Sequence, residues 1–261
     1  AKEKMILYIH FTMDDNLTLA EKVKERFKRM FSGVFYDRYI RGLWVMAEGI
    51  IYDMFKEKEH VISDKEKQKE IIRNADEFFV SNDYGTGTVF VLGLFCVSGG
   101  KRYLIKSYYW DAKEEGYQKS DRQYVQDTKD FVEGYSINAF IIPNDALSFI
   151  AELYNEGVGP LFIYERTPGS VMDGIRTQAN YLKHGEYKIF DNESNQPIIK
   201  EYASYVWDEK AQARGEDKPL KENDHGKDME RYFHDGYNRL QQHRVDTQDE
   251  EFEDMETISP Y

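Results

Sequence analysis

The 261-residue chain has few cysteines and no long apolar run, whereas many cysteines would indicate a secreted protein and a long apolar run a membrane protein. Its one cysteine, Cys96, lies in an apolar run and cannot form an internal disulfide, which is typical of a reducing compartment. Its apolar runs all fall short of the roughly 20 residues that a membrane-spanning helix needs. The amino end is charged and lacks a small-residue cleavage site, so we expect no secretory signal and no membrane partner.

Basic charge is also scarce, because 35 Lys and Arg face 48 Asp and Glu, for a net charge of −13. Non-specific DNA affinity comes from basic side chains that neutralise phosphates, so this sign alone argues against DNA. The excess is uneven, however, since Asp246 to Glu256 holds seven acids and no base. Carboxylates that bind a metal also count as negative until the metal is present. The charge therefore leaves a nucleic-acid partner open.

The sequence contains no Gly-x-x-x-x-Gly-Lys-Ser/Thr motif, so we expect no ATP hydrolysis by this chain. It starts at Ala1 rather than Met, and we expect it to be a fragment of a longer protein. Apolar residues make up 41%, with 20 Tyr and 16 Phe, which is enough bulk for a well-buried core. These values predict a globular domain, with or without a smaller second piece.

Residues 1–74 and the residues after them differ in their sequence patterns. The first part shows a helical pattern from Leu17 to about Phe31, with Asp14 to Asn16 as its N-cap, and then a charged stretch at 63–74. We interpret that stretch as a surface helix or linker and as the domain boundary. From Glu77 onward, three β-type runs separated by short glycine turns predict an antiparallel meander.

Helices and strands alternate after the meander. The pattern predicts helices at 120–133, 145–157, 170–185 and 197–215, and strands at 137–144, 159–166 and 187–190. Asp145 and Ser170 stand where N-caps belong. A last helix follows, to about Gln242. We therefore predict an α/β domain over 75–243, with a mixed sheet flanked by helices, and a disordered acidic tail over 244–261.

The start of that last helix carries a compact polar cluster. Asp224 and Asp228 are four residues apart and His225 and Asp228 are three apart, so their side chains share one helix face. Two carboxylates and an imidazole suit a hard divalent cation or a general-base pair. Asp224 could alternatively cap the helix.

Two further acids follow strands. Asp83 ends the first run of the meander, and Asp145 follows the strand at 137–144. If these strands are neighbours, their ends meet at the sheet edge where open α/β folds place ligands. Converging carboxylates repel one another unless cations lie between them, and two Mg²⁺ or Mn²⁺ ions about 4 Å apart would suit phosphodiester hydrolysis. The alternative is that Asp83 and Asp145 are ordinary turn and cap residues.

Basic side chains flank the acidic helix face. They could contact phosphates or form a solvated surface. They are Lys218, Lys221, Lys227 and Arg231.

Six segments together carry a resemblance. They read HFTMDDN (10–16), GVFYDRYIRGLWVMAEGIIY (33–52), NDYGTGT (82–88), SFIAEL (148–153), VMDGIR (171–176) and YVWDEKAQARGEDKPLKENDHGKDMERY (205–232). In this order they resemble the large terminase subunit of tailed bacteriophages, the motor that packages viral DNA. Because the last segment is long, it makes the resemblance specific, whereas NDYGTGT or VMDGIR alone is a weak signal. A related nuclease of the same fold, such as a junction resolvase, fits segments 10–16 and 33–52 less well.

The resemblance implies a carboxy-terminal nuclease domain with a ribonuclease H-like fold. Such a domain is expected to be a metal-dependent endonuclease that cuts concatemeric duplex DNA in the host cell cytoplasm, with the portal and the small terminase subunit as partners. By the same resemblance, Asp83 and Asp228 are metal-binding catalytic residues and His225 accompanies them. Residues 1–74 would be the end of the ATPase region and its linker.

One position departs from the family pattern. The family has a carboxylate directly after the middle strand, where this chain has Pro143, and Asp145 follows two residues later. Either Asp145 substitutes for it in a site of Asp83, Asp145, His225 and Asp228, or the second metal position is weakened. The competing hypothesis is a module that grips or docks DNA in the packaging motor, with weak or no nuclease activity.

Overall fold

The computed structural model describes residues 9–85, 89–167 and 169–258, with side chains as far as residue 246. In the described part of the chain, seven strands form one sheet in the order β1-β7-β4-β3-β2-β5-β6. The strands are β1 (Val61–Ile62), β2 (Glu77–Asp83), β3 (Val89–Ser98), β4 (Lys101–Asp111), β5 (Ala139–Pro143), β6 (Leu161–Tyr164) and β7 (Tyr187–Phe190).

The predicted meander and the predicted mixed sheet are confirmed. Strands β2, β3 and β4 pair antiparallel in sequence, and β5 pairs parallel with β2, so that Ser81 lies opposite Ile141. Strand β3 is buried along its length up to Ser98 because helices cover both faces of the sheet. The carboxyl ends of β2 and β5 therefore lie at the same edge, as the sequence predicts for neighbouring strands. Residues 86–88 of the predicted turn lie outside the described residues.

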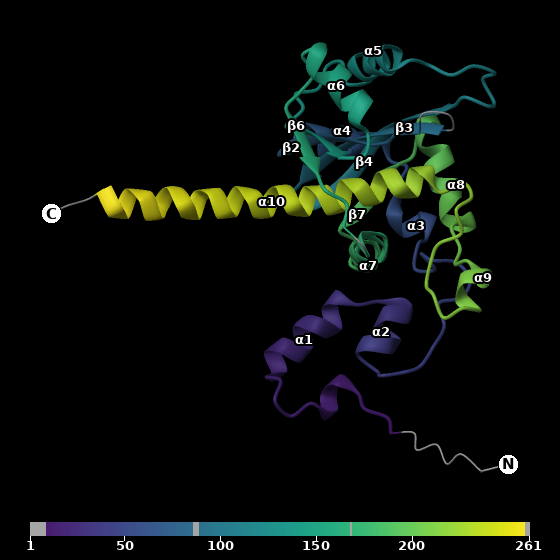
Figure 1. Ribbon diagram of the computed structural model, residues 1–261, viewed down its shortest axis with the longest axis vertical. Helices are drawn as coiled ribbons and strands as arrows, with labels where there is room; N and C mark the ends of the chain where they lie inside the picture. Colours follow the sequence, from purple (N-terminus) through teal and green to yellow (C-terminus); the bar gives the residue numbers. More distant parts are fainter. Residues whose placement is uncertain (1–8, 86–88, 168, 259–261) are drawn as a thin grey trace.

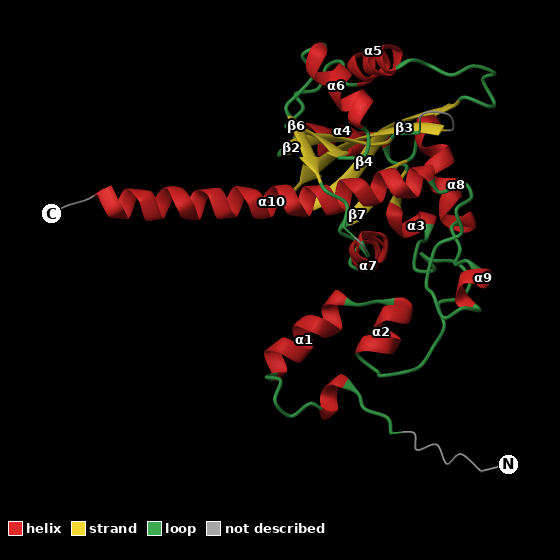
Figure 2. Cartoon of the chain, in the orientation of Figure 1, coloured by secondary structure: helices red, strands yellow, loops and turns green. Residues whose placement is uncertain are grey.

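Helices cover the two faces of the sheet as separate layers (Figures 1 and 2). On one face, α4 (Lys65–Arg73), α5 (Asp121–Phe131) and α6 (Leu147–Asn155) pack against side chains such as Phe90 and Leu92. On the other, α7 (Ser170–Lys183), α8 (Gln196–Ser204) and α10 (His225–Ile258) pack against Val91 and Phe95. Successive side chains of β3 therefore point into the cores on opposite faces of the sheet, as they do in any strand. The 3-10 helix η2 (Glu193–Asn195) leads directly into α8.

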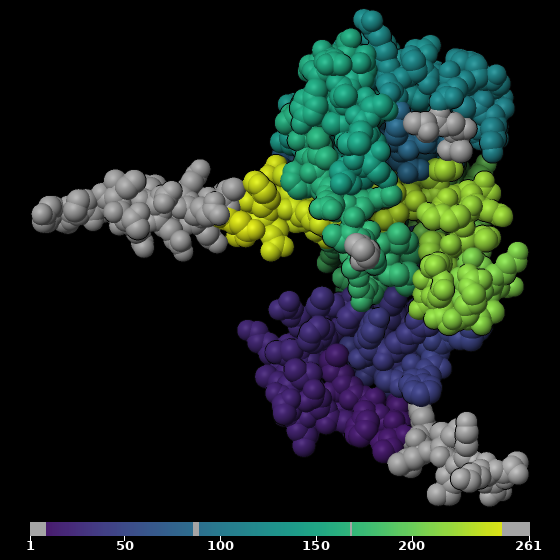
Figure 3. Space-filling model, viewed as in Figure 1, coloured from purple at the N-terminus to yellow at the C-terminus, as the bar shows by residue number. Residues whose placement is uncertain are grey.

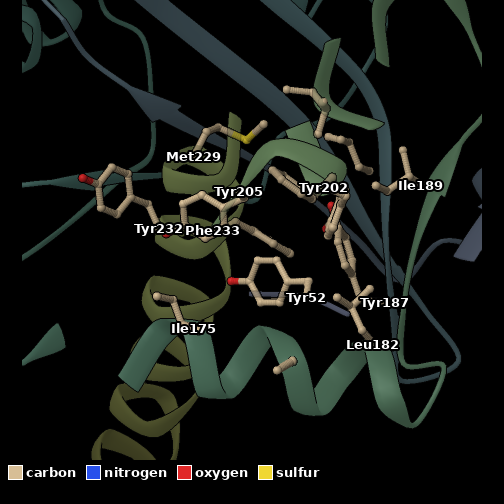
Figure 4. Close-up of a cluster of buried hydrophobic side chains, with 14 of the residues drawn as sticks. Tyr52, Ile175, Leu182, Tyr187, Ile189, Tyr202, Tyr205, Met229, Tyr232 and Phe233 are labelled. Carbon is tan, nitrogen blue, oxygen red and sulfur yellow. The ribbon is translucent and has the colours of Figure 1, made fainter. Parts of the chain in front are cut away.

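The long helix α10 crosses the second face at close range. A Cβ added to Gly93 on β3 would lie 2.3 Å from the Met229 sulfur, so glycine leaves room for this side chain of α10 against the sheet. One turn on, the ring of Phe233 stacks on Phe95 with centroids 3.8 Å apart. Figure 4 shows Met229 and Phe233 pointing from α10 into the aromatic cluster that includes Tyr205. This contact fixes where the amino end of α10 lies over the sheet.

An amino-terminal segment of short helices lies beside this three-layer body (Figure 3). It contains η1 (Met13–Asp15), α1 (Glu21–Met30) and α2 (Gly33–Tyr39), whereas α3 (Glu57–His60) packs against β1 and β7 in the body. Tyr52 is buried in the core and β1 pairs with β7, so residues before 74 contribute to the body. The division of the chain at 74 stays a prediction.

Several element boundaries differ from the prediction. The expected helix at 197–215 is two helices, α8 and α9 (Glu209–Gln212), because Val206 and Trp207 bridge to Ile50 and Pro219 instead of continuing the turn. Helix α1 begins at Glu21, after Ala20, rather than at the predicted cap of Asp14 to Asn16, which form η1 and its end instead.

Two predicted caps and one predicted end are also wrong. Ala146 and Gly169, not Asp145 and Ser170, occupy the N-cap positions of α6 and α7. Helix α10 passes the predicted end near Gln242 and continues to Ile258, where a disordered tail is expected. The sequence there is rich in Glu, with Gln and Met, and these residues favour helix. Residues 259–261 lie outside the described residues.

The structure bears on the single cysteine and on the expected lack of a membrane-spanning helix. Cys96 is buried, and burial raises the pKa of its thiol to about 12, which makes it inert. Over the described residues, the helices include none that combines the length and apolarity needed to cross a membrane.

A buried histidine gives the fold a predictable weakness in acid. His234 on α10 is fully buried between Tyr187, Phe233 and Tyr181, and its ring nitrogens find no hydrogen-bond partner among the described residues. Burial, followed by the charges of Arg102 and Lys227, holds the pKa of His234 well below its ordinary value. The folded state thus binds fewer protons than the unfolded state below about pH 6.5.

We therefore expect stability to fall as the pH drops below about 6.5, and His234→Phe to remove part of that loss, up to about 2 kcal/mol at about pH 5. Urea unfolding of both proteins at neutral and acid pH measures it. His184→Gln, at an exposed position, is the control. An equal acid loss in the wild type and His234→Phe would show that His234 is not responsible.

Candidate functional site

A cleft of about 690 Å³ lies where the carboxyl end of β2 meets the first turn of α10. Strand β4 and the loop before α10 complete its walls. Carboxylates dominate its polar lining, with an imidazole and three cationic side chains. These groups are Asp83, Asp111, Glu222, Asp224, Asp228, His225, Lys113, Lys221 and Arg166.

The structure brings Asp83 and His225 into direct contact. Asp83 is the last residue of β2 and His225 the first of α10, and Nδ1 of the imidazole lies 2.8 Å from Oδ2 of the carboxylate. The hydrogen bond to Asp83 raises the pKa of His225, against the effect of burial. Burial raises the pKa of Asp83, which His225 opposes and Asp228 reinforces. The sequence prediction that these two residues converge is met in the structure.

Asp228 lies on the next turn and is held by two cations. Its Oδ1 accepts a hydrogen bond from Arg231 at 2.8 Å and its Oδ2 lies 3.1 Å from the ammonium of Lys221. Burial would raise the pKa of Asp228, but the charges of Arg231 and Lys221 outweigh it and hold the pKa below its usual range. Lys221 also lies 3.0 Å from Asp224. One ammonium therefore bridges two buried carboxylates at the cleft floor.

Asp145 stands apart from this group. Its side chain is 51% exposed, is not part of the cleft lining, and pairs with Arg166 at 2.5 Å. Arg166 in turn donates to the hydroxyl of Tyr232, and both Arg166 and Tyr232 line the cleft. The structure thus connects Asp145 to the cleft through a guanidinium. The two-residue displacement from Pro143, which ends β5, places it in the turn before α6.

The basic residues flanking the acidic face divide into three kinds. Lys227 and Arg231 are buried, so neither phosphate contact nor a solvated surface describes them. Lys218 is exposed and pairs with Glu216. Lys221 lies in the cleft itself. The sequence contained a sign that Lys227 forms an ion pair within the helix. It lies three residues before Glu230, a spacing that puts both side chains on one helix face.

The chemistry of the lining fits a divalent cation. Carboxylate oxygens are the donors that Mg²⁺ and Mn²⁺ prefer, and imidazole is an accepted additional ligand. The ammonium of Lys221 already shows where positive charge is stabilised, between Asp224 and Asp228. In the arrangement described, though, no three His, Cys, Asp or Glu side chains within the described residues converge as a ready-made metal site. Binding would require Lys221 to move.

Several solved structures are similar to this chain in fold, and some of them are also similar in sequence. A large terminase from a thermophilic bacteriophage, solved in complex with ADP, is 43% identical, with a TM-score of 0.75, and the match covers 87% of this chain and 55% of that one. The P22 large terminase nuclease domain is 19% identical (TM-score 0.52) over 72% of this chain and 92% of that one. The nuclease domain of the bacteriophage SPP1 large terminase, solved with bound Mn, is 17% identical (TM-score 0.50), over 72% of this chain and 97% of that one.

No family model matches the chain, and no curated protein matches it either. The fold is the ribonuclease H-like fold of terminase nuclease domains. With the sequence identity to the thermophilic phage protein, the chain belongs to the large terminase family of tailed bacteriophages. It spans about 55% of the length of that large terminase.

Proposed function

We propose that this chain is the metal-dependent endonuclease module of a phage packaging terminase and cuts concatemeric duplex DNA. The observation that carries the proposal is the convergence of Asp83, Asp228 and His225 in one cleft of a chain from this family. That the SPP1 domain was solved with bound Mn supports a divalent cation here as well. The carboxylates of the lining count towards the net charge of −13 until a cation is bound.

The chain's own residues have distinct roles in this proposal. Asp83 and Asp228 would hold Mg²⁺ or Mn²⁺, with His225 orienting Asp83 and Asp145 completing a second position once it separates from Arg166. Two bound cations would supply a polarised water and neutralise charge on the leaving oxygen of a phosphodiester. Arg166, 38% exposed at the cleft, would pair with a phosphate of the DNA.

Plasmid cleavage tests the proposal. Purified protein with Mn²⁺ or Mg²⁺ is expected to convert supercoiled plasmid to linear products, and EDTA to stop the conversion. Wild-type protein that leaves the plasmid intact at every Mn²⁺ concentration would contradict the proposal. Cutting that is equally strong in Asp83→Ala and Asp228→Ala would contradict the assignment of the site.

The competing proposal is a module that grips or docks DNA with little cutting. It is favoured by the engagement of Asp228 with Lys221 and Arg231, and by Pro143 at the position of the family's carboxylate. It predicts DNA-dependent assembly without metal-dependent products. A filter-binding assay with duplex DNA, run beside the cleavage assay, separates the two.

Partners and location follow from the family rather than from the site. We propose duplex DNA as substrate, the portal and the small terminase subunit as assembly partners, and the host cell cytoplasm as the place of action. Co-purification of this chain with each packaging component, with and without DNA, tests the partners one at a time.

Lys221 gives a prediction about the cation. Because its ammonium lies 3.0 and 3.1 Å from Asp224 and Asp228, it competes with a metal for their charge. Exposed ion pairs contribute about 0.2–1 kcal/mol, and Lys221 is largely exposed. Lys221→Met is therefore expected to tighten Mn²⁺ binding by about two- to fivefold in calorimetric titrations. Lys218→Met, outside the cleft, should change nothing. Weaker binding in Lys221→Met would show that the lysine assists rather than competes.

A further inference from the structure

The first turn of α10 is anchored by a carboxylate from another helix. Glu201 on α8 is 6% exposed. Its Oε1 accepts a hydrogen bond from the backbone N–H of Gly226 at 3.2 Å, and its Oε2 accepts one from the backbone N–H of Lys227 at 3.0 Å. The first N–H groups of a helix have no acceptor within the helix, and negative charge is favoured at this end. Glu201 therefore supplies from α8 what an N-cap residue would supply locally.

The sequence of α10 is adapted to this contact. A Cβ added to Gly226 would lie 2.5 Å from Oε2 of Glu201 and 2.5 Å from Cδ1 of Ile198. Glycine at 226 thus leaves room for the Glu201 carboxylate and the Ile198 side chain beside the turn, and a larger residue would displace them. Burial raises the pKa of Glu201 to about 7, against the charge of Lys227 and the two backbone donors. Lys227 directs its own ammonium to Glu230, 2.6 Å away, so its backbone remains the partner of Glu201.

The two residues that Glu201 holds are flanked by proposed site residues. His225 directly precedes Gly226, and Asp228 directly follows Lys227. The 2.8 Å contact between His225 and Asp83 joins this turn to the end of β2. A displacement of the turn by a fraction of an ångström would lengthen that contact, because His225 belongs to the anchored turn.

We propose that Glu201 is a positioning residue of the nuclease site, which fixes the first turn of α10 so that His225 and Asp228 meet Asp83. This rests on the proposed function for the identity of the site, whereas the anchoring itself is a property of the metal-free protein. A merely structural role would lower stability and leave the geometry of the remaining folded molecules unchanged. The two roles therefore differ in what happens to His225 and to metal affinity.

The experiment uses two variants of Glu201 and one matched control. Glu201→Leu removes both acceptors, and Glu201→Gln keeps one carbonyl oxygen. Asp64→Ala is the control, because Asp64 caps α4 through two comparable hydrogen bonds, to Glu66 and Lys67, outside the cleft lining. For each protein, the thermal midpoint, the imidazole ¹⁵N signals of His225 and the Mn²⁺ dissociation constant are measured, with His225→Gln assigning the signals.

Groups that orient metal ligands typically change metal affinity by about 10–100-fold when removed. We expect Glu201→Leu to weaken Mn²⁺ binding by about that factor and to shift the His225 signals in metal-free protein. Glu201→Gln should weaken binding by about two- to tenfold, with a smaller shift. Asp64→Ala should lower the thermal midpoint and match the wild type in the other two measurements.

The proposal is overturned if both Glu201 variants match Asp64→Ala in Mn²⁺ affinity and His225 signals. If Glu201→Leu does not fold, Glu201→Gln decides alone, by the same comparison. Failure of the proposed function gives a different result: wild-type protein that binds Mn²⁺ and shows the His225 shift in Glu201→Gln, yet cuts no plasmid.

Discussion

Replacing Asp228 by asparagine is expected to lower plasmid cleavage at saturating Mn²⁺ by at least about 10³-fold. The proposed cations would contribute several kcal/mol to the transition state, and about 4 kcal/mol corresponds to this factor. Asparagine is the sharper choice than alanine because Asp228 also pairs with the buried Arg231. An amide oxygen still accepts from Arg231, whereas alanine leaves a buried guanidinium without this partner.

Asp83→Asn should cause a loss of the same order, since Asp83 reaches the cleft from β2 and is joined to α10 through His225. Asp208→Ala is the matched control, because Asp208 caps α9 and lies outside the cleft lining. Initial rates over a Mn²⁺ titration separate weak binding from a slow step. A loss below about tenfold in both variants would remove these carboxylates from the reaction.

The second large effect concerns stability rather than cleavage. Lys227 and Glu230 are both fully buried on the inner face of α10, with Nζ 2.6 Å from Oε2. Glu230 also accepts hydrogen bonds from Gln178, Tyr187 and Tyr202. Removing one partner of a buried pair leaves an uncompensated charge, so Lys227→Met is expected to lower the free energy of unfolding by about 3–5 kcal/mol.

Urea unfolding at neutral pH measures this loss. The double variant Lys227→Met/Glu230→Gln is expected to recover part of it, because the neutral amide no longer needs the ammonium. A loss below about 1 kcal/mol for Lys227→Met would show that Glu230 is adequately satisfied by its three neutral donors. The comparison also tells whether the charge or the hydrogen bonds of this pair matter more.

The sheet and the main site contact were predictable from local patterns. Three β-type runs separated by glycine turns predicted β2, β3 and β4, and the runs at 137–144, 159–166 and 187–190 predicted β5, β6 and β7. The meeting of Asp83 with His225 followed from placing both at one sheet edge, and the family resemblance supplied the same pair. Both inferences depend on spacing along the chain, which a sequence displays directly.

Tertiary contacts account for what the sequence did not reveal. Helix 197–215 breaks because Val206 and Trp207 bridge to segments far away in sequence, and no local propensity records that. The sequence predicted Asp145 as a helix N-cap, but its carboxylate instead pairs with Arg166, which follows β6 in the chain. Glu201 was visible only as an acid among Ile198 and Tyr202 on an apolar helix face, a pattern that signals a buried carboxylate without naming its partner.

The most direct measurement is anomalous diffraction from crystals of this chain soaked in Mn²⁺. The account predicts a manganese peak in the cleft, bound by Asp83 and Asp228, with the Lys221 ammonium displaced from Asp228. A second peak beside Asp145, with Arg166 moved away, would support the two-ion form. A cleft without a manganese peak at saturating Mn²⁺ would contradict the account. Lys221 would then still lie within about 3 Å of Asp228, the distance of a hydrogen-bonded ion pair.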